Sequence, residues 1–538
     1  MIIKSLVEKL KEKRIRNFFI GGAAFGGGVV AICAIVIGVV MFNKVDDPVT
    51  PDDTDIVIID GPSSTPLGDI TDIIDIDETD ELDFSDIMDL ISSDLEAGET
   101  AYLNYPLEMT GEPIEYEIVA PTDALAHSPG SILMENGNYA IIQTHDDILS
   151  LKYFGAAGDG VTDDTEAIKS ALSFCKGKTL TVPSGTYVVS SAIDIPSNIT
   201  IEGEGQDSMF IAADGYRPGK DLFRARTKQN ITIDGVCFDG NSDVNTREMG
   251  HSARDGIHMM DLWDCTNVCI KNCYYQNNVY CAIRIVGNSS DLSFYENKFT
   301  QVDCGIETLG TGTMSRITIC NNVFDGHQNS EPISFFGKGS TVTDVLIDNN
   351  IVINKTCGNG IYVGNGGTYT NFTITNNYLS KDAVGICCVG ISNLTLTGNT
   401  VEETSTGGGI KLVQCSDAKV YENVVARINQ NGFYIKDCSD IELYNNTINN
   451  CGMVNRDFFP MDIRGYCSNV NIYSNTFEET NLSLSQYSVA CRSTGSVTIS
   501  DNYFTDSSRI WLAKESSGVR VSNRDVITKN DSKTNNVD

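Results

Sequence analysis

Residues 371–377 read NFTITNN, and 22 residues further on residues 393–399 read NLTLTGN. Both stretches alternate apolar and polar residues, which is typical of a β-strand, and both end in an asparagine. The same pattern recurs every 21–29 residues, and its asparagines are Asn272, Asn297, Asn322, Asn350, Asn377, Asn399, Asn423, Asn446, Asn475, Asn502 and Asn523. Self-similarity at this period predicts a solenoid in which the asparagine side chains stack and bond from coil to coil.

A second strand is predicted in each repeat, as in residues 281–287, CAIRIVG, and 359–364, NGIYVG. The apolar residue after the small residue is expected to point inward, and the next residue outward. The predicted outward row is His258, Arg284, Glu307, Ser334, Tyr362, Cys387, Lys411, Tyr434, Asp462, Ala490 and Trp511. Parallel crossovers are right-handed, and a leucine-rich consensus with helical segments is absent. We therefore expect an all-β fold, a right-handed parallel β-helix.

The N-terminal region has the pattern of a membrane anchor. Residues 18–42 carry no charge, six basic residues lie in residues 1–16, and two aspartates follow at 46 and 47. The length and the charge bias predict a single transmembrane helix at 17–43, with a cytoplasmic basic tail at 1–16 and an extracellular β-helix. A cleaved signal peptide is the alternative, but its apolar region would be shorter and would end at a small-residue cleavage site.

The remaining segments follow from composition. Residues 44–99 hold 19 acidic residues and no basic residue after Lys44, so we expect an extended acidic linker. Residues 100–150 are expected to form an N-terminal cap segment, residues 151–530 the β-helix and residues 531–538 a polar tail. The formal net charge of −34 excludes nucleic-acid binding, which needs a basic surface.

No cofactor or metal site is assigned from the sequence. The acidic stretch 75–81 lacks the glycine and spacing of an EF-hand, so only weak, non-specific Ca²⁺ binding is possible there. Many of the 17 cysteines occupy repeat positions, which favours stacked core thiols over disulfides. Cys265, Cys269 and Cys273 have a metal-ligand spacing for a helix, but their segment is predicted to be a strand.

The most specific sequence motif spans residues 153–174, YFGAAGDGVTDDTEAIKSALSF, and residues 177–205, GKTLTVPSGTYVVSSAIDIPSNITIEGEG. The first part predicts a turn and then a helix at about 164–175, which Asp163 and Glu166 would open as a capping box. Its apolar face suits the open end of a solenoid. Two strands are expected after it, separated by a turn at Pro183–Gly185.

This text resembles the opening of the pectate-lyase-like superfamily, and in particular its rhamnogalacturonase/epimerase-like and tailspike-like members. The matching residues are Phe154-Gly155, Gly158-Asp159-Gly160, Thr162 to Thr165, Ala167-Ile168, Val182 to Tyr187 and Glu202-Gly203. The resemblance implies a right-handed parallel β-helix, a polysaccharide as partner and, by analogy with tailspikes, a possible trimer. It does not select a reaction, because the superfamily contains hydrolases, lyases, epimerases and non-catalytic adhesins.

Polysaccharide-active members bind glycan along the outward face of one sheet, and the first coils of the predicted row carry its densest group of functional side chains. The catalytic candidates are Asp255, Asp303, Glu307 and His258, and the substrate-binding candidates are Arg284, Tyr362, Asp261 and Lys338. The text RDGIHM resembles a polygalacturonase strand and places Asp255 on that family's aspartate. Two further polygalacturonase motifs are missing, since Tyr280-Cys281 and Asp303-Cys304-Gly305 stand in their places.

Two chemistries remain open. Asp255 and Asp303 lie two coils apart, roughly 10 Å by strand spacing, which suits an inverting carboxylate pair. In a lyase or epimerase, Arg284 or a bound Ca²⁺ would neutralise a uronate while His258 or Tyr362 removes the proton. Arg284 is also expected to pair with Glu307.

The sequence thus predicts a cell-surface hydrolase or lyase that acts on an acidic polysaccharide. The alternative is a non-catalytic, glycan-binding or adhesin-like β-helix, in which His258, Arg284 and Glu307 form only a surface charge ladder.

Overall fold

The computed structural model describes residues 82–537 with short internal gaps. The gaps are 105–112, 123–124, 126–127, 217–220, 246–256, 327–329, 355–357, 382–383, 405–406, 455–456, 479–486, 506–509, 523–526 and 531–535. The expected anchor at 17–43 and most of the expected linker therefore lie outside the described residues. Within residues 82–537 as described, no helix has the length and apolar character needed to cross a bilayer.

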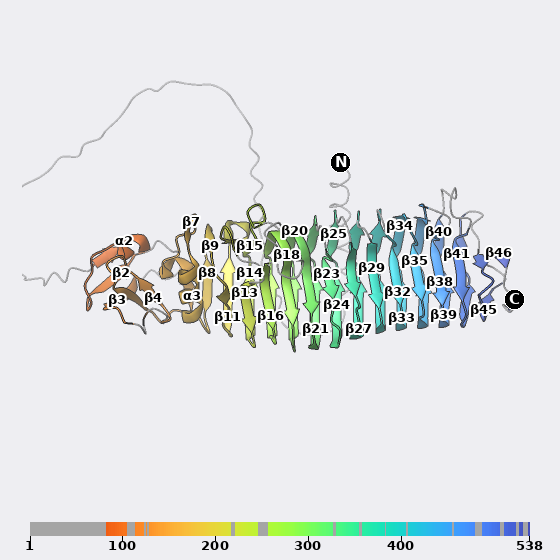
Figure 1. Ribbon diagram of the computed structural model, residues 1–538, viewed down its shortest axis with the longest axis horizontal. Helices are drawn as coiled ribbons and strands as arrows, with labels where there is room; N and C mark the ends of the chain where they lie inside the picture. The colour runs from red at the N-terminus through yellow and green to blue at the C-terminus, as the bar shows by residue number, and fades with distance from the viewer. Residues whose placement is uncertain are drawn as a thin grey trace, which may run out of the picture. The chain divides into compact units, whose positions relative to one another are not determined.

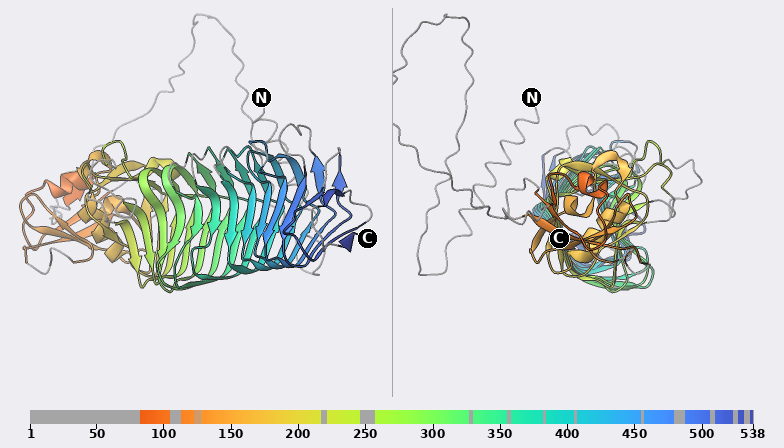
Figure 2. Two further views of the ribbon diagram at one scale, coloured as in Figure 1. Left: turned by 45° about the vertical axis from the view of Figure 1, so that its right-hand side comes forward. Right: turned by 90° about the vertical axis from the view of Figure 1, so that its left-hand side faces the viewer.

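The main body is a stack of coils (Figures 1 and 2), and most coils contain three strands. In two of them a single long strand, β18 (Tyr274–Val286) or β20 (Lys298–Leu309), replaces two shorter ones. In one coil the strands are β24 (Ser340–Asp348), β25 (Ile351–Ile353) and β26 (Asn359–Val363). Strand β24 pairs in parallel with β27 (Thr368–Thr375) of the next coil, within a 16-stranded sheet. Strands β25 and β26 belong to a 26-stranded sheet, again with parallel pairing. The expected parallel β-helix is confirmed.

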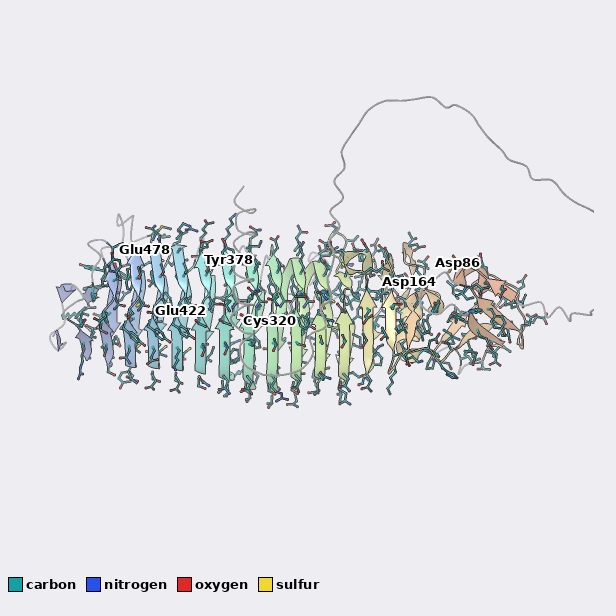
Figure 3. The ribbon with its side chains drawn as sticks, turned by 180° about the vertical axis from the view of Figure 1, so that it is seen from behind. Asp86, Asp164, Cys320, Tyr378, Glu422 and Glu478 are labelled. Atoms are coloured by element: carbon teal, nitrogen blue, oxygen red, sulfur yellow. The ribbon has the colours of Figure 1, made fainter. Side chains whose placement is uncertain are left out.

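Two rows of strands face the viewer in Figure 3. Tyr378 and Glu478 mark the row of short strands that includes β28 (Tyr378–Ser380) and β40 (Thr476–Glu478). Cys320 and Glu422 mark the 16-stranded sheet, through β21 (Gly312–Cys320) and the end of β33 (Ser416–Tyr421). Apolar side chains alternate with polar ones along these strands and fill the interior, where Phe238, Tyr275, Phe299 and Phe324 stack in consecutive coils.

The asparagine ladder runs along one corner of the stack. The backbone N–H and the side-chain amide of Asn350 both donate to Oδ1 of Asn377, each at 2.9 Å. The same two bonds repeat along Asn297, Asn322, Asn350, Asn377, Asn399, Asn423, Asn446, Asn475 and Asn502, all of them buried. Every coil thus satisfies buried amide groups of the coil before it.

The ladder differs from the prediction at both ends. Asn272 is exposed, and its place is taken by Cys273, whose N–H donates to Oδ1 of Asn297 at 2.9 Å. Asn272 occupies the preceding position, where the backbone is left-handed (φ 52°) and asparagine is favoured. Asn523 lies outside the described residues.

The register of the predicted row is confirmed from Arg284 to Trp511, although Ser334, Cys387, Asp462 and Ala490 are buried. The first member of the row is wrong. Asp261 lies opposite Arg284, whereas His258 lies opposite Asp221 in the preceding coil. The prediction took Gly256 as the small residue before the inward side chain. Met259 stands at that position instead, so the pattern was shifted by three residues in this coil.

The N-terminal end of the stack is covered by a five-stranded sheet in the order β1-β2-β3-β5-β4. Its strands are β1 (Leu82–Phe84), β2 (Thr100–Leu103), β3 (Ile114–Val119), β4 (Ser131–Leu133) and β5 (Tyr139–Gln143). Strand β1 and helix α2 (Ile87–Ile91) fall inside the range predicted as linker, so the folded part begins earlier than expected. Tyr116 joins this sheet to the coils by donating to the carbonyl of Tyr153 at 2.7 Å.

Helix α3 (Thr165–Phe174) forms where a helix was predicted, and it buries Ile168, Ala171 and Leu172. The predicted capping box is wrong. Asp164, labelled in Figure 3, precedes the helix, and its carboxylate accepts the N–H groups of Ala157 and Val188 at 2.6 and 3.3 Å. Asp164 therefore ties the glycine-rich turn to the first coils, which explains the local signature without catalysis.

At the other end, β47 (Asn536–Val537) pairs with β45 (Val519–Val521). The described part of the chain thus continues the stack into the expected tail at 531–538.

Candidate functional site

A cluster of charged side chains lies on the outward side of five successive coils. It is carried by β13 (Asp221–Arg226), β16 (His258–Trp263), β18 (Tyr274–Val286), β20 (Lys298–Leu309) and the segment before β23 (Ile333–Phe335). The members of the outward row here are Arg224, Asp261, Arg284, Glu307 and Ser334. A second column, three residues earlier on each coil, contains Asp221, His258, Cys281, Cys304 and Glu331.

The first half of the cluster is an internally neutralised ion-pair network. Asp261 is fully buried and accepts from Nε of Arg284 at 2.7 Å. Arg284 also reaches Asp221 at 3.4 Å, and Arg226 reaches the other oxygen of Asp221 at 3.1 Å. These cations and a hydrogen bond from His258 hold the pKa of Asp221 below its usual range despite burial. Asp261, a predicted substrate-binding residue, therefore serves first to hold Arg284.

His258 belongs to the same network rather than to the exposed row. Only 3% of the residue is exposed, and its Nδ1 lies 3.1 Å from Oδ1 of Asp221. Burial lowers the pKa of His258, so the imidazole is neutral at physiological pH. Its ring meets the ring of Tyr280 edge-on, with centroids 4.7 Å apart. The contacts of His258 orient Asp221, and they do not present the imidazole to a glycan as the sequence prediction required.

Glu307 is the strongest candidate for proton transfer. It is 8% exposed, and burial together with the nearby charge of Glu331 raises its pKa to about 7. The expected Arg284–Glu307 ion pair is wrong. Within the described part of the chain, the ion pairs of Arg284 go to Asp261 and Asp221, on the side away from Glu307.

Glu331 lies on the coil after Glu307 and is only partly buried. Its Oε1 accepts from the side-chain amide of Asn359 at 3.1 Å, and its Oε2 accepts from the hydroxyl of Ser330 at 3.1 Å. Both bonds orient the Glu331 carboxylate. The two glutamates thus form a pair in which Glu307 has a pKa near neutrality and Glu331 is held in place by hydrogen bonds.

One group of side chains could hold a metal ion. One donor atom from each of Cys281, Cys304 and Glu307 can be chosen so that all three lie within 4.8 Å of one another. Two thiols and a carboxylate suit Zn²⁺, and they do not suit Ca²⁺, which takes oxygen ligands. Burial raises the pKa of the Cys281 thiol, so without a metal both sulfurs are ordinary core thiols.

The other predicted site residues are spread around this cluster. Tyr362 lies two places along the row from Glu307 and packs against Phe336, with ring centroids 4.9 Å apart. Asp303 is buried, and its carbonyl accepts the N–H of Ser330 at 3.1 Å. Lys338 is exposed at the turn between β23 and β24, off the row. Asp255 lies outside the described residues, and its role stays a prediction.

Sequence reasoning missed Asp221, Arg226 and Glu331. All three could have been found by extending the repeat, because Asp221 and Glu331 stand three residues before the row and Arg226 two residues after it. The prediction considered the row and a few residues beside it, but it did not follow these two neighbouring positions from coil to coil.

Comparison with known proteins supports the fold. Residues 304–458 match the family model described as "Right handed beta helix region". The chain is 36% identical over 118 residues to the pre-neck appendage protein of Bacillus phage B103, a match that covers 20% of this chain and 14% of the relative. It is 31% identical over 113 residues to a capsule K30/K69-specific depolymerase of Klebsiella phage K5-2, with the same coverage. The chain thus spans about a seventh of the length of these relatives.

Two solved structures are similar to this chain at low identity. The A-module of a mannuronan C-5 epimerase from Azotobacter vinelandii is 16% identical with a TM-score of 0.49, covering 69% of this chain and 99% of that one. An exopolygalacturonase from Thermotoga maritima is 16% identical with a TM-score of 0.42, covering 67% and 92%. The family match and the observed coils together identify this chain as a right-handed parallel β-helix protein, as its resemblance to the pectate-lyase-like superfamily implied.

Proposed function

We propose that this protein is a polysaccharide-active enzyme whose chemistry is carried by Glu307 and Glu331. The observation that carries the proposal is the pKa of about 7 at Glu307, beside a second carboxylate on the next coil. Pairs of carboxylates in unlike environments are the usual means of acid–base catalysis at glycosidic bonds. The names of two relatives, both capsule depolymerases, agree with this substrate class.

In hydrolysis, Glu307 gives its proton to the glycosidic oxygen as the C–O bond breaks. Glu331 accepts a proton from the water that attacks the anomeric carbon. In a lyase, an anionic base removes the proton at C5 and Glu307 protonates the departing oxygen, so the same pair supports either reaction. Tyr362 offers a ring for stacking of a sugar, and Arg284, Asp261 and Lys338 remain proposed binding residues around it. Asp255 and Asp303 remain proposed as additional acid–base groups.

The proposal is tested with the full-length protein on pectins, alginates and capsular polysaccharides, each with and without Ca²⁺. Reducing ends and unsaturated-uronide absorbance are followed together. A rise in both channels identifies a lyase, and a rise in reducing ends alone identifies a hydrolase. Glu307→Gln is expected to lower turnover by roughly 10²–10⁴-fold, as is usual for loss of a general acid.

Glu402→Gln is the control, because Glu402 is a partly buried carboxylate on another row of strands, where it accepts from the hydroxyl of Tyr378 at 2.5 Å. Its turnover should stay at the wild-type value. Unchanged turnover in Glu307→Gln would overturn the assignment.

The second candidate is a non-catalytic glycan-binding or adhesin-like surface protein. The ion-pair network of Asp221, Asp261, Arg226 and Arg284 favours it, because the charges of two carboxylates and two cations already offset one another. Glycan binding without product in either channel would establish this alternative.

We further propose that residues 17–43 anchor the β-helix at the cell membrane, with residues 1–16 in the cytoplasm. Protease treatment of intact cells should then remove the β-helix and leave the basic tail protected. A trimer is proposed by analogy with tailspikes, and light scattering of the purified protein measures it.

A further inference from the structure

A second group of functional side chains lies several coils further along the same outward row. It is carried by β32 (Ile410–Val413), β35 (Phe433–Lys436), β38 (Met461–Gly465), β41 (Val489–Ser493) and β44 (Ile510–Leu512), of which the first four are labelled in succession in Figure 1. The row here reads Lys411, Tyr434, Asp462, Ala490 and Trp511. Two residues later on each strand, a neighbouring row reads Lys436, Arg464 and Arg492.

Cations and aromatic rings alternate within this group. Tyr434 has Lys411 Nζ 5.8 Å from its ring centroid and the Arg464 guanidinium 5.6 Å from it. Arg492 lies 5.2 Å from the ring of Phe459 and 5.8 Å from the ring of Trp511.

Tyr487 extends the aromatic part of the group. Its ring stacks on Trp511, with centroids 5.7 Å apart and planes 28° apart. Trp511 and Tyr434 are both partly exposed, so their rings are accessible from solvent.

The group carries a surplus of positive charge. Asp462 is fully buried and accepts from Arg464 at 2.7 Å and from Arg492 at 2.6 Å. Asp437 lies 3.9 Å from Lys436. Four cations thus face two carboxylates, which leaves two positive charges on a chain whose formal charge is −34.

The two arginines could serve only to neutralise the buried Asp462. That role does not account for Lys411, which is exposed and has no ion pair among the residues described. It also does not account for a second arginine on one carboxylate, or for the partly exposed rings on either side. A surplus of cations beside exposed rings is the chemistry that recognises an anionic sugar, whose ring stacks while its anionic group pairs.

We infer that Lys411, Tyr434, Arg464, Arg492 and Trp511 form a binding site for an anionic oligosaccharide, here termed the basic–aromatic site. One sugar ring stacks on Tyr434, with its carboxylate or sulfate at Lys411 and Arg464. Another sugar ring stacks on Trp511, with its anionic group at Arg492, because Lys411 and Trp511 are four steps apart, roughly 19 Å at the spacing of parallel strands. From Glu307 to Asp462 there are six steps along the row, roughly 29 Å at the spacing of parallel strands. The site is therefore separate from the glutamate pair, and it stands whether or not the protein is an enzyme.

The test uses the full-length protein with Trp263→Phe, which leaves Trp511 as the sole tryptophan of the chain. Polygalacturonate, dextran sulfate and neutral dextran are titrated while Trp511 fluorescence is followed. We expect a saturable change with at least one polyanion, a Kd that weakens steeply between low and high salt, and no change with dextran.

The variants are chosen to separate binding from folding. Lys411→Gln should weaken binding at least several-fold, and Lys411→Arg should retain it, because the lysine is exposed and holds no structural ion pair. Lys419→Gln is the matched control, since Lys419 is an exposed lysine on β33 of the 16-stranded sheet. Glu307→Gln should bind like wild type, which separates this site from the proposed catalysis.

The outcomes also identify the anion. Binding of polygalacturonate alone indicates a carboxylated sugar, binding of dextran sulfate alone a sulfated one, and binding of both a site selective for charge. Equal responses to dextran, or equal losses in Lys411→Gln and Lys419→Gln, would overturn the inference. The inference would also be overturned if Trp511 fluorescence did not change and Lys411→Gln bound the polyanions as wild type does.

Discussion

Arg284 lies directly opposite Glu307 in the parallel ladder, yet its guanidinium turns to Asp261 on the other side and bonds to it at 2.7 Å. The charge of Arg284 is thereby shared with Asp261 and Asp221, and it offsets only part of the burial of Glu307. This arrangement leaves Glu307 with a pKa near neutrality on a surface that also carries a strong cation.

The raised pKa of Glu307 predicts a pH dependence of stability. The folded protein holds this proton up to about pH 7, whereas an unfolded glutamate loses it near pH 4.5, so the folded state binds more protons in between. The free energy of unfolding should therefore fall as pH rises from about 4.5 to 7, by about 3 kcal/mol from this group. Chemical denaturation of wild type and Glu307→Gln at pH 5 and pH 8 measures it.

The glutamine variant should gain stability relative to wild type at pH 8 and little at pH 5. Glu331→Gln tests whether the charge of Glu331 contributes to the raised pKa of Glu307. Removal of that charge should lower the pKa of Glu307, so the loss of stability should occur at lower pH. Identical pH profiles for wild type and Glu307→Gln would contradict the assignment.

The loss in free energy of unfolding on replacing an aspartate that pairs with an arginine should depend on how deeply that aspartate is buried. Asp261 is fully buried on Arg284, whereas Asp194 is exposed and bonds to Arg224 at 2.5 and 2.8 Å. Asp261→Asn should lower the free energy of unfolding by about 3–5 kcal/mol, because it leaves Arg284 without its main partner. Asp194→Asn should cost about 0–1 kcal/mol. Similar losses in the two variants, measured by urea denaturation, would show that the network is not held by Asp261.

The asparagine ladder predicts a sharp contrast between two neighbouring residues. Asn377→Ala removes the acceptor of two bonds from Asn350 and should cost about 1–3 kcal/mol for each buried group left unpaired. Asn376 is exposed with a left-handed backbone (φ 55°), so Asn376→Gly keeps that conformation and should cost little. Denaturation midpoints compare the two, and an equal loss would contradict the role of the ladder.

Burial also predicts which thiols react. The thiols of Cys281 and Cys304 are buried with raised pKa values, whereas Cys269 is partly exposed on β17 (Thr266–Lys271). Iodoacetamide at pH 8 should label Cys269 first, and it should reach Cys281 and Cys304 only after unfolding. Mass spectrometry of timed samples measures the order. Rapid labelling of Cys281 in the folded protein would show an ionised, accessible thiol.

The sequence was enough to predict the repeating coils, but it was not enough to predict the contacts within the candidate site. Period-2 alternation and the recurring asparagine predicted the ladder from Asn297 and the row from Arg284, because each coil repeats the same local pattern. The prediction was wrong where the repeat is irregular. Met259 stands where a small residue was expected, and Cys273 stands where an asparagine was expected.

The sequence pattern does not show which charged side chains pair with one another. Arg284 has Asp261 on one side and Glu307 on the other, and alternation alone cannot tell which carboxylate takes the bond. Burial is the main cause of the raised pKa of Glu307, and the charge of Glu331 adds to it. Glu331 comes from a segment ahead of the strand, where the repeat has no clear signature. Burial and pairing between coils are properties of the assembled stack.

The ladder from Asn297 to Asn502 also bears on how such a protein changes over evolutionary time. An interior rung gives two bonds to the following coil and receives two from the preceding one, so each interior coil has the same connections above and below. Duplication or deletion of a whole coil would leave every remaining amide with a partner. The distance between the glutamate pair and the proposed basic–aromatic site can therefore change in whole-coil steps, and natural selection can adjust it without disturbing the ladder.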